Sequence, residues 1–452
     1  MSINKFLSRF GITSERTIGI TKHIGLSFFY KLGAILANFL LVPLSLEYLG
    51  KTNYGIWLII ISFIGWFTFF DVGLGHGLRN KFSEAKAKKN MHLVKAYVSS
   101  AYFTLVLISI TLIILFFLVN FFIDWTYIFN TNVNLKNKLS YLMLIVFSFF
   151  AIQLVFKLIT TIYTADQKPS IGVLVNFLTQ IISLTAVWLL LKSGTNSLFL
   201  FGLIYSTIPV LILLCLNFFS FKTIFKPYKP SLKLWQKKYV KDIFGLGLNF
   251  FIVQIAAVIL YTTDNLIITH LFSPNEVVPY NIAFKYFSIV TMVFSIIVTP
   301  YWSAITDAFT QEDFNWIKKS MKMLIRTSFW LSLLTLLMLI FSKPFYYFWV
   351  GSKVTIPFKL SLFMAVFVIQ TSFIQSFTFF INGTGKIKIQ MILGVSMALL
   401  NIPLSILLVK YFKFDTSGVI LATILCNFVG MIIYPIQYIK IIDKKAKGIW
   451  NE

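Results

Sequence analysis

The hydrophobic positions of this chain fall into long, nearly unbroken runs that short polar segments separate. A helix needs about 20 mainly apolar residues to cross a hydrocarbon core of about 30 Å. The runs contain glycine and proline and lack the alternation of barrel strands, which favours helices. The pattern predicts twelve membrane-spanning helices. They cover residues 24–46, 54–70, 97–122, 139–162, 170–191, 198–221, 243–271, 280–305, 324–348, 359–382, 390–409 and 418–440.

The polar segments divide this pattern into two halves of six helices. A basic segment at 222–242 follows the sixth helix and is expected to connect the halves. No loop is long enough for an independent soluble domain. The expected parts are an interfacial N-terminal segment, a first lobe, a basic cytoplasmic linker, a second lobe and a cytoplasmic tail. They cover residues 1–23, 24–221, 222–242, 243–440 and 441–452.

A weak internal repeat supports two related halves. The pair Glu84-Ala85 recurs as Asp307-Ala308 at an offset of 223 residues. Tyr54 and Tyr280 begin corresponding second helices at an offset of 226. Halves of equal topology imply a pseudo-twofold axis along the membrane normal.

The composition agrees with a protein surrounded by lipid. Hydrophobic residues make up 58% of the chain and charged residues only 12%, whereas soluble domains carry about 25% charged residues. One water-facing globule could not hide that much apolar surface. The predicted fold class is therefore an all-α polytopic membrane protein.

The excess of cations predicts the orientation of the chain. The chain has 40 lysines and arginines but only 15 acids. Such an excess of cations is also found in proteins that bind nucleic acid. Here the cations cluster in loops, so we expect contact with anionic lipids and no nucleic acid. With both termini in the cytoplasm, 28 cations lie in cytoplasmic segments and nine outside. The positive-inside rule therefore predicts cytoplasmic termini.

No motif in the chain indicates an enzyme, a metal site or a cofactor. The four histidines show no metal-ligand spacing. The segment Gly383–Lys386 is followed by Ile387 in place of the serine or threonine of a P-loop. The chain therefore offers no motif for ATP hydrolysis, and energy would have to come from a proton or sodium gradient, from consumption of a product, or from both.

The segment Leu41–Ala85 carries the most recognisable pattern of residues. Its first helix ends in proline, a Leu-Gly turn and Tyr-Gly-Ile-Trp follow, and Asp-Val-Gly-Leu-Gly with Leu-Arg-Asn-Lys closes the second helix. Two more recognisable stretches, Tyr261–Phe287 and the Asn382–Lys386 loop, lie in the second half of the chain. In these features the chain resembles polysaccharide flippases of the O-antigen translocase type. That family belongs to the multidrug/oligosaccharidyl-lipid/polysaccharide exporter superfamily.

The resemblance implies two lobes that form a V around a central cavity. It implies movement of an oligosaccharide on undecaprenyl pyrophosphate from the cytoplasmic to the outer leaflet of the bacterial inner membrane. A glycan polymerase and a chain-length regulator are then expected partners. A cation-coupled multidrug exporter and a lipid II flippase are alternatives within the superfamily. A membrane-embedded glycosyltransferase or polymerase would need a large extramembrane loop or an acid cluster, and neither is visible.

Three lysines inside predicted spans are candidates for binding the pyrophosphate head group. Ionisable residues are costly within a membrane and mark functional sites. Lys31 lies in the first helix with Asn38 seven residues later on the same face, and Lys157 and Lys285 lie in the fourth and eighth helices. Lysine offers a mobile point charge for phosphate oxygens. The alternative for Lys157 and Lys285 is snorkelling to the interface.

Asp264 is the only acid deep within a predicted span. A carboxylate in such a place suits a cation or proton site that couples transport to an ion gradient. Alternatively it neutralises one buried lysine, such as Lys31. Asn38 and Asp264 correspond at the offset of 226.

Four charged residues lie at predicted cytoplasmic helix ends: Asp71, Arg79, Glu84 and Asp307. They are candidates for ion pairs between the lobes that close a cytoplasmic gate and break when the cavity opens inward. The alternative is ordinary helix capping and interfacial pairing, in which each pair contributes little.

Overall fold

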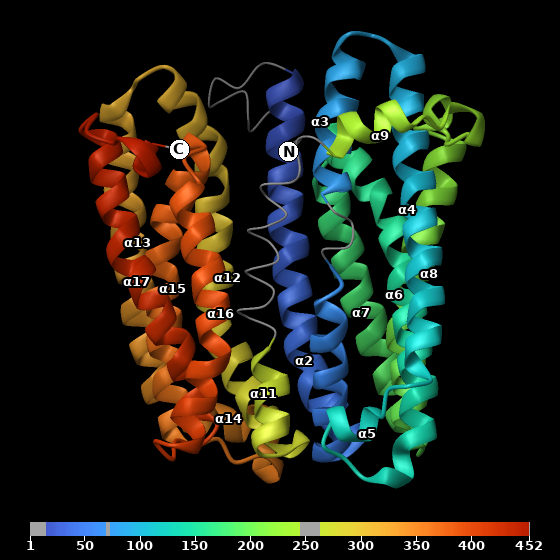
Figure 1. The fold of residues 1–452 in the computed structure, drawn as a ribbon, viewed down its shortest axis with the longest axis vertical. Coiled ribbons are helices and arrows are strands. Elements are labelled where there is room, and N and C mark those ends of the chain that lie inside the picture. Colours follow the sequence, from blue (N-terminus) through green and yellow to red (C-terminus); the bar gives the residue numbers. More distant parts are fainter. Residues whose placement is uncertain (1–14, 69–72, 245–262, 452) are drawn as a thin grey trace, which may run out of the picture. The chain divides into compact units, whose positions relative to one another are not determined.

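The computed structural model describes residues 15–68, 73–244 and 263–451, and all regular structure in these ranges is helical (Figure 1). Ten of the described helices are long and apolar enough to cross a membrane. These observations confirm the predicted all-α, multi-pass membrane class.

The long helices are α2 (Glu15–Gly65), α4 (Met91–Asn120), α6 (Lys136–Ala165), α7 (Ser170–Lys192), α8 (Leu198–Lys222), α12 (Pro274–Thr310), α13 (Phe314–Ile340), α15 (Phe358–Thr384), α16 (Lys388–Lys410) and α17 (Ser417–Ile442). The shorter elements are α3 (Leu74–Ala87), α5 (Trp125–Ile128), α9 (Lys237–Phe244), α11 (Asp264–Leu271), α14 (Ser342–Val350), and the 3-10 helices η2 (Val133–Leu135), η3 (Lys226–Tyr228), η4 (Leu232–Leu234), η5 (Gly351–Lys353) and η6 (Gly448–Asn451).

Helix α2 contains two of the twelve expected segments. Its backbone leaves helical geometry at Gly50, where φ is 71° and ψ is 167°. Side chains disfavour this region, so glycine suits the break between the two parts. The other nine candidate spans match nine expected segments. The remaining segment, 243–271, lies largely outside the described residues, so the count of twelve and the side of the termini stay predictions.

The predicted segment 324–348 has the wrong boundaries. Helix α13 begins ten residues earlier, because the carboxylate of Asp313 accepts a hydrogen bond from the backbone N–H of Trp316 at 3.0 Å and caps the helix there. The helix ends at Ile340, and α14 follows as a separate element with Pro344 in its first turn. Proline lacks a backbone N–H and suits the first turn of a helix.

The helices pack into two compact units. Of the described residues, unit 1 comprises 15–50, 67–68, 73–127 and 132–244, and unit 2 comprises 51–66, 128–131 and 263–451. The second part of α2 thus packs with the second half of the chain. The division into lobes at 24–221 and 243–440 stays a prediction.

The two halves repeat the same order of elements. In the first half α4, α5, η2, α6, α7 and α8 follow one another, and in the second half α13, α14, η5, α15, α16 and α17 do so. Lys89 and Glu312 adopt left-handed backbones with φ of 55° and 56°. Each precedes an N-capping side chain, Asn90 or Asp313. These matches have the same offset of 223 residues as the sequence repeat.

The linker, residues 222–242, lies along α4 and does not hang free. The backbone N–H groups of Ser231 and Gln236 donate to the buried hydroxyls of Ser99 and Ser100 at 3.0 and 3.3 Å. Trp235 Nε1 donates to Thr104 Oγ1 at 3.1 Å. The linker's lysines remain exposed. The segment therefore presents a basic surface on a fixed backbone.

The end of the chain covers one end of unit 2 in a similar way. Gln437 of α17 donates to the backbone carbonyl of Trp450 at 3.4 Å. Lys440 Nζ lies 3.7 Å from the centroid of the Trp450 ring. Residues 441–451, expected as a tail, therefore pack on the unit.

Candidate functional site

Asp264 is the first residue of α11, and its side chain is buried, with 7% of its surface exposed. The hydroxyl of Tyr280 in α12 donates a hydrogen bond to Asp264 Oδ2. Asp264 Oδ1 is buried and has no hydrogen-bond partner among the described residues. Buried polar atoms are rarely left unpaired, so this oxygen is suited to a proton, a cation or water.

A second row of polar contacts runs beside this carboxylate. Asn281 Nδ2 donates to Asn265 Oδ1 at 2.7 Å, and Asn265 Nδ2 donates to Ser62 Oγ at 2.7 Å. Ser62 in turn donates to the backbone carbonyl of Leu58 at 2.9 Å. These bonds tie α11 to α12 and to the second part of α2. They hold the start of α11, and with it Asp264, in place.

Helix α11 also packs against α16 and α17, where uncharged polar side chains are buried. Asn401 Nδ2 donates to Thr423 Oγ1 at 2.9 Å, and Gln370 Nε2 donates to the carbonyl of Ile424 at 3.1 Å. Asn401 Oδ1, Gln370 Oε1 and Ser405 Oγ are buried without a partner in the described part of the chain. Unit 2 thus holds several spare acceptor oxygens inside its membrane-spanning helices.

This arrangement can bind a small hard cation or a proton. One phenol hydrogen bond does not compensate a buried carboxylate charge, because desolvation of the ion costs several kcal/mol. A proton removes the charge, and a sodium ion would neutralise it with oxygen ligands. Sequence reasoning identified Asp264 but missed the uncharged acceptors, which look like ordinary residues of apolar runs. Among the described residues, no three His, Cys, Asp or Glu side chains gather as a metal site would require.

Lys31 and Asn38 lie on the first part of α2 in unit 1, and both side chains are half-buried. Asn38 Nδ2 lies 3.5 Å from Gln180 Oε1 of α7, to which it donates. The two helices can approach closely at Gly33, since a Cβ there would lie 2.4 Å from the Phe177 ring. Gln180 joins Asn38 as a polar neighbour that sequence reasoning did not single out.

The other two candidate lysines lie in different units. Lys157 is exposed on α6 of unit 1, and Lys285 is half-buried on α12 of unit 2. Neither forms an ion pair with a residue that the structure describes. A shared cavity for Lys31, Lys157 and Lys285, and the alternative pairing of Lys31 with Asp264, stay predictions.

The candidate gate residues are described only in part. Arg79 is exposed on α3, and Glu84 on the same helix pairs with Lys88 at 2.7 Å and Lys81 at 3.3 Å. Hydrogen bonds from Lys88 and then Lys81 lower the pKa of the Glu84 carboxyl. Asp71 and the side chain of Asp307 lie outside the described residues. The gate therefore stays a prediction.

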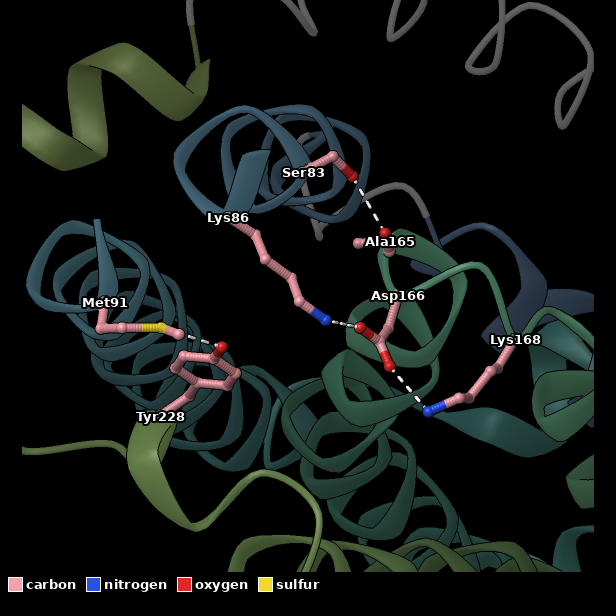
Figure 2. A network of polar contacts seen from close by, with 7 residues as sticks. All are labelled: Ser83, Lys86, Met91, Ala165, Asp166, Lys168 and Tyr228. Carbon is pink, nitrogen blue, oxygen red and sulfur yellow. Dashed lines mark hydrogen bonds and ion pairs between the residues drawn. The ribbon is translucent and has the colours of Figure 1, made fainter. Parts of the chain in front are cut away.

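Sequence reasoning missed the polar network at the end of α6 (Figure 2). The carboxylate of Asp166, with 7% of its side chain exposed, forms an ion pair with Lys86 of α3. It forms a second ion pair with Lys168, in which Lys168 Nζ lies 2.9 Å from Asp166 Oδ2. Ser83 Oγ donates to the carbonyl of Ala165 at 3.0 Å. These contacts fasten α3 to α6. Lys86 and Asp166 are 80 residues apart, so no local pattern could pair them.

Comparisons with known proteins place the chain in a family. Residues 20–306 match the family model described as polysaccharide biosynthesis protein, and residues 250–407 match the MatE model. A Yersinia pseudotuberculosis protein described as an O-antigen export protein is 22% identical over 365 residues, which cover 79% of this chain and 82% of that protein. A Salmonella typhi protein described as an O-antigen transporter is 24% identical over 266 residues, 58% of this chain and 59% of that protein.

A solved structure shares the fold. It is an inward-facing conformation of a multidrug resistance MATE family transporter of the MOP superfamily, with a TM-score of 0.77 and 13% identity. The match covers 94% of this chain and 100% of that one. At this identity the likeness concerns the fold alone. The family model spans more than half of the sequence, and the chain therefore belongs to the polysaccharide biosynthesis protein family, with the fold of MOP superfamily transporters.

Proposed function

We propose that this protein is a flippase for an oligosaccharide carried on undecaprenyl pyrophosphate. It moves the lipid-linked repeat unit from the cytoplasmic to the outer leaflet of the bacterial inner membrane by alternating access. The observation that carries the proposal is the match, over most of both chains, to a relative described as an O-antigen export protein. The MOP superfamily fold supports it. The protein acts as a transporter and not as an enzyme.

The substrate poses a problem of charge. A pyrophosphate with sugars attached must cross a region of low dielectric while its polyprenyl tail stays in lipid. Leaving the head group's charge bare there would be prohibitive. Lys31 and Lys157 in unit 1 and Lys285 in unit 2 supply compensating charge within membrane-spanning helices, and Asn38 supplies an amide beside Lys31. These residues bind the head group during transport.

Asp264 couples transport to an ion gradient in this proposal. Its buried carboxylate and unpaired Oδ1 support binding of a proton or a sodium ion. The adjoining bonds of Tyr280 and Asn265 connect the charge state of Asp264 to α12 and to the second part of α2. Binding or release of the ion then changes the packing of these helices.

Asp71, Arg79, Glu84 and Asp307 form a cytoplasmic gate in this proposal, and the exposed lysines of the linker contact anionic lipid. A glycan polymerase and a chain-length regulator receive the product on the outer side. The exposed position of Arg79 and Glu84 on α3 supports the proposed gate. The exposed lysines on the docked linker support the proposed contact with anionic lipid.

Deletion of the gene tests the proposed function. The expected result is loss of a surface polysaccharide and accumulation of its polyprenyl-linked repeat unit on the cytoplasmic face. Mass spectrometry of the accumulated lipid names the substrate, and a plasmid copy restores export. Normal surface polysaccharide in the deletion strain would contradict the proposal. Increased sensitivity to cationic drugs in that strain would instead favour a multidrug exporter, the alternative that the match of residues 250–407 supports.

A further inference from the structure

A pocket of about 490 Å³ lies in unit 2 between the end of α13 and the start of α15. Its walls come from α14, from η5 and the loop after it, and from the first turn of α15. Aromatic, hydroxyl and aliphatic side chains, one lysine and one glycine line it: Tyr346, Tyr347, Phe358, Ser342, Ser352, Thr355, Ser361, Val354, Ile356, Lys343 and Gly351. Figure 1 shows α14 at the end of unit 2 opposite the C-terminus. By the orientation that the cation count predicts, this is the outer end.

The floor of the pocket is held rigidly. Tyr346 is 5% exposed, and its hydroxyl shares a hydrogen bond of 3.1 Å with Ser361 Oγ of α15. Its ring lies 5.3 Å from the ring of Tyr286 in α12, edge to face. Val350 and Val354, on either side of η5, are also buried. The pocket therefore keeps its shape without a ligand, which reduces the cost of binding.

The rim of the pocket offers unused polar groups. Lys343 forms no ion pair with any residue that the structure describes, and its side chain is exposed. Within the described ranges the hydroxyls of Ser352 and Thr355 have no hydrogen-bond partner. Tyr347 and Phe358 expose 72% and 64% of their surfaces beside these groups. Ring faces and free polar groups thus share one concave surface.

This combination suits a sugar. The C–H faces of a pyranose ring can pack on an aromatic ring while its hydroxyls bond to serine, threonine and lysine. The volume lies within the range of small-molecule sites, which combine apolar walls with a few convergent polar groups. An acyl chain would fill the walls but leave the hydroxyls and the ammonium unused. The ammonium of Lys343 adds attraction for an acidic sugar.

We propose that this pocket binds a sugar residue of the exported glycan at the outer face, with Lys343 favouring an acidic residue. The statement that this sugar belongs to the exported glycan rests on the proposed function. The pocket would hold the head group after translocation and so hinder its return to the cytoplasmic side.

Binding to the purified full-length protein tests the pocket without requiring transport. The probes are cellobiose, cellobiouronic acid and the lipid-free oligosaccharide released from the strain's own surface polysaccharide. Tyr347→Ala removes a pocket-lining ring, and Phe348→Ala removes the next ring of α14, which is 87% exposed and lies outside the pocket. Lys343→Gln removes the charge. Ser352→Trp fills the pocket from an exposed position of η5 and serves as a second blocking variant.

We expect titration calorimetry to show binding by the wild type, with cellobiouronic acid binding more tightly than cellobiose at low salt. Tyr347→Ala and Ser352→Trp should weaken binding at least tenfold, and Phe348→Ala should change it less than twofold. Lys343→Gln should abolish only the preference for the acid. Equal binding by Tyr347→Ala and Phe348→Ala, or no binding of any probe by the wild type at millimolar concentration, would overturn the proposal.

Failure of the pocket and failure of the proposed function give different results. If deletion abolishes surface polysaccharide but the pocket variants bind sugar like the wild type, only the pocket is wrong. If deletion leaves the polysaccharide intact while sugar binding still depends on Tyr347, the pocket stands and the proposed function is wrong.

Discussion

Among the described residues, Asp264 is a single side chain under a clear physical constraint. Its carboxylate is buried in unit 2, receives one hydrogen bond from Tyr280 and leaves Oδ1 without a partner in the described ranges. An ionised carboxylate in such a place needs further compensation. A bound proton or cation supplies it, and exchange of that ion is what coupling requires.

Replacing this carboxylate by an amide should uncouple transport. Asp264→Asn keeps the shape of the side chain but cannot bind or release a proton. We expect export to fall at least tenfold and to lose its response to proton and sodium gradients, measured as the rate of surface polysaccharide appearance with and without ionophores. Asp124→Asn, an acid in the loop after α4, is the control. Full-rate export by Asp264→Asn with an intact gradient response would exclude the coupling role.

The intramembrane lysines should matter for the substrate's charge. Lys31→Ala and Lys285→Ala each remove a cation from a membrane-spanning helix. We expect each to reduce surface polysaccharide severalfold and both together to abolish it, at normal protein amounts by immunoblot. Lys410→Ala, at the end of α16, is the matched control and should export normally. Normal surface polysaccharide in the double variant would refute the cationic cavity.

The loop after α4 contains a local ion site with a defined pH dependence. Hydrogen bonds from Thr126 and then Lys136 lower the pKa of Asp124 to about 2. Its folded pKa lies below its unfolded value of about 3.9, so its contribution to stability is full at neutral pH and disappears as pH falls from about 4 through about 2. Asp124→Asn should lower the melting temperature slightly at pH 7 and progressively less as the pH falls toward 2. An equal effect at both pH values would contradict this assignment.

Among the elements, the docked linker explains how a basic loop becomes a fixed surface. Its backbone bonds to α4, and α9 approaches α3 at Gly77, where a Cβ would lie 2.0 Å from the backbone oxygen of Ile243. Only glycine permits this contact without displacement of the backbone. The exposed lysines of the linker are therefore held in one place.

Gly77→Ala should detach this contact. Alanine favours a helix by about 1 kcal/mol over glycine, but the clash with a backbone atom costs about 1–3 kcal/mol and should dominate. We expect a lower melting temperature and faster tryptic cleavage within the linker. Gly172→Ala, whose Cβ would meet its nearest neighbour at 3.6 Å, should be neutral or stabilising. Equal cleavage rates for the two variants would show that the contact does not hold the linker.

Hydrophobic runs predicted most helices because lipid imposes length and composition on each span separately. Helix boundaries were harder to predict where a capping side chain sets them, as Asp313 does at the start of α13. The partners of Asp166 and the acceptors around Asn401 could not be predicted, because they depend on contacts between residues far apart in sequence. Asp264 could be recognised, since one acid in an apolar run is costly enough to require a function.

For the whole molecule, two features bear on the proposed transport cycle: the repeated order of elements, and the unequal distribution of charged residues between the two units. Each half carries six elements in the same order, and the caps at Asn90 and Asp313 correspond. Unit 1 contains two of the three intramembrane lysines, and unit 2 contains Asp264. In the proposed cycle one unit therefore contributes more of the charge that meets the substrate, and the other holds the coupling ion.

Reconstitution of the purified protein into liposomes tests the central claim most directly. The liposomes carry a lipid-linked oligosaccharide of the producing strain in both leaflets, and a glycosidase that cannot cross the membrane is added outside. With protein and an ion gradient, we predict that the enzyme digests nearly all of the glycan lipid. Liposomes without protein, or with Asp264→Asn, should stop near the half that faces outward. Digestion that also stops near half in wild-type liposomes would contradict flipping by this protein.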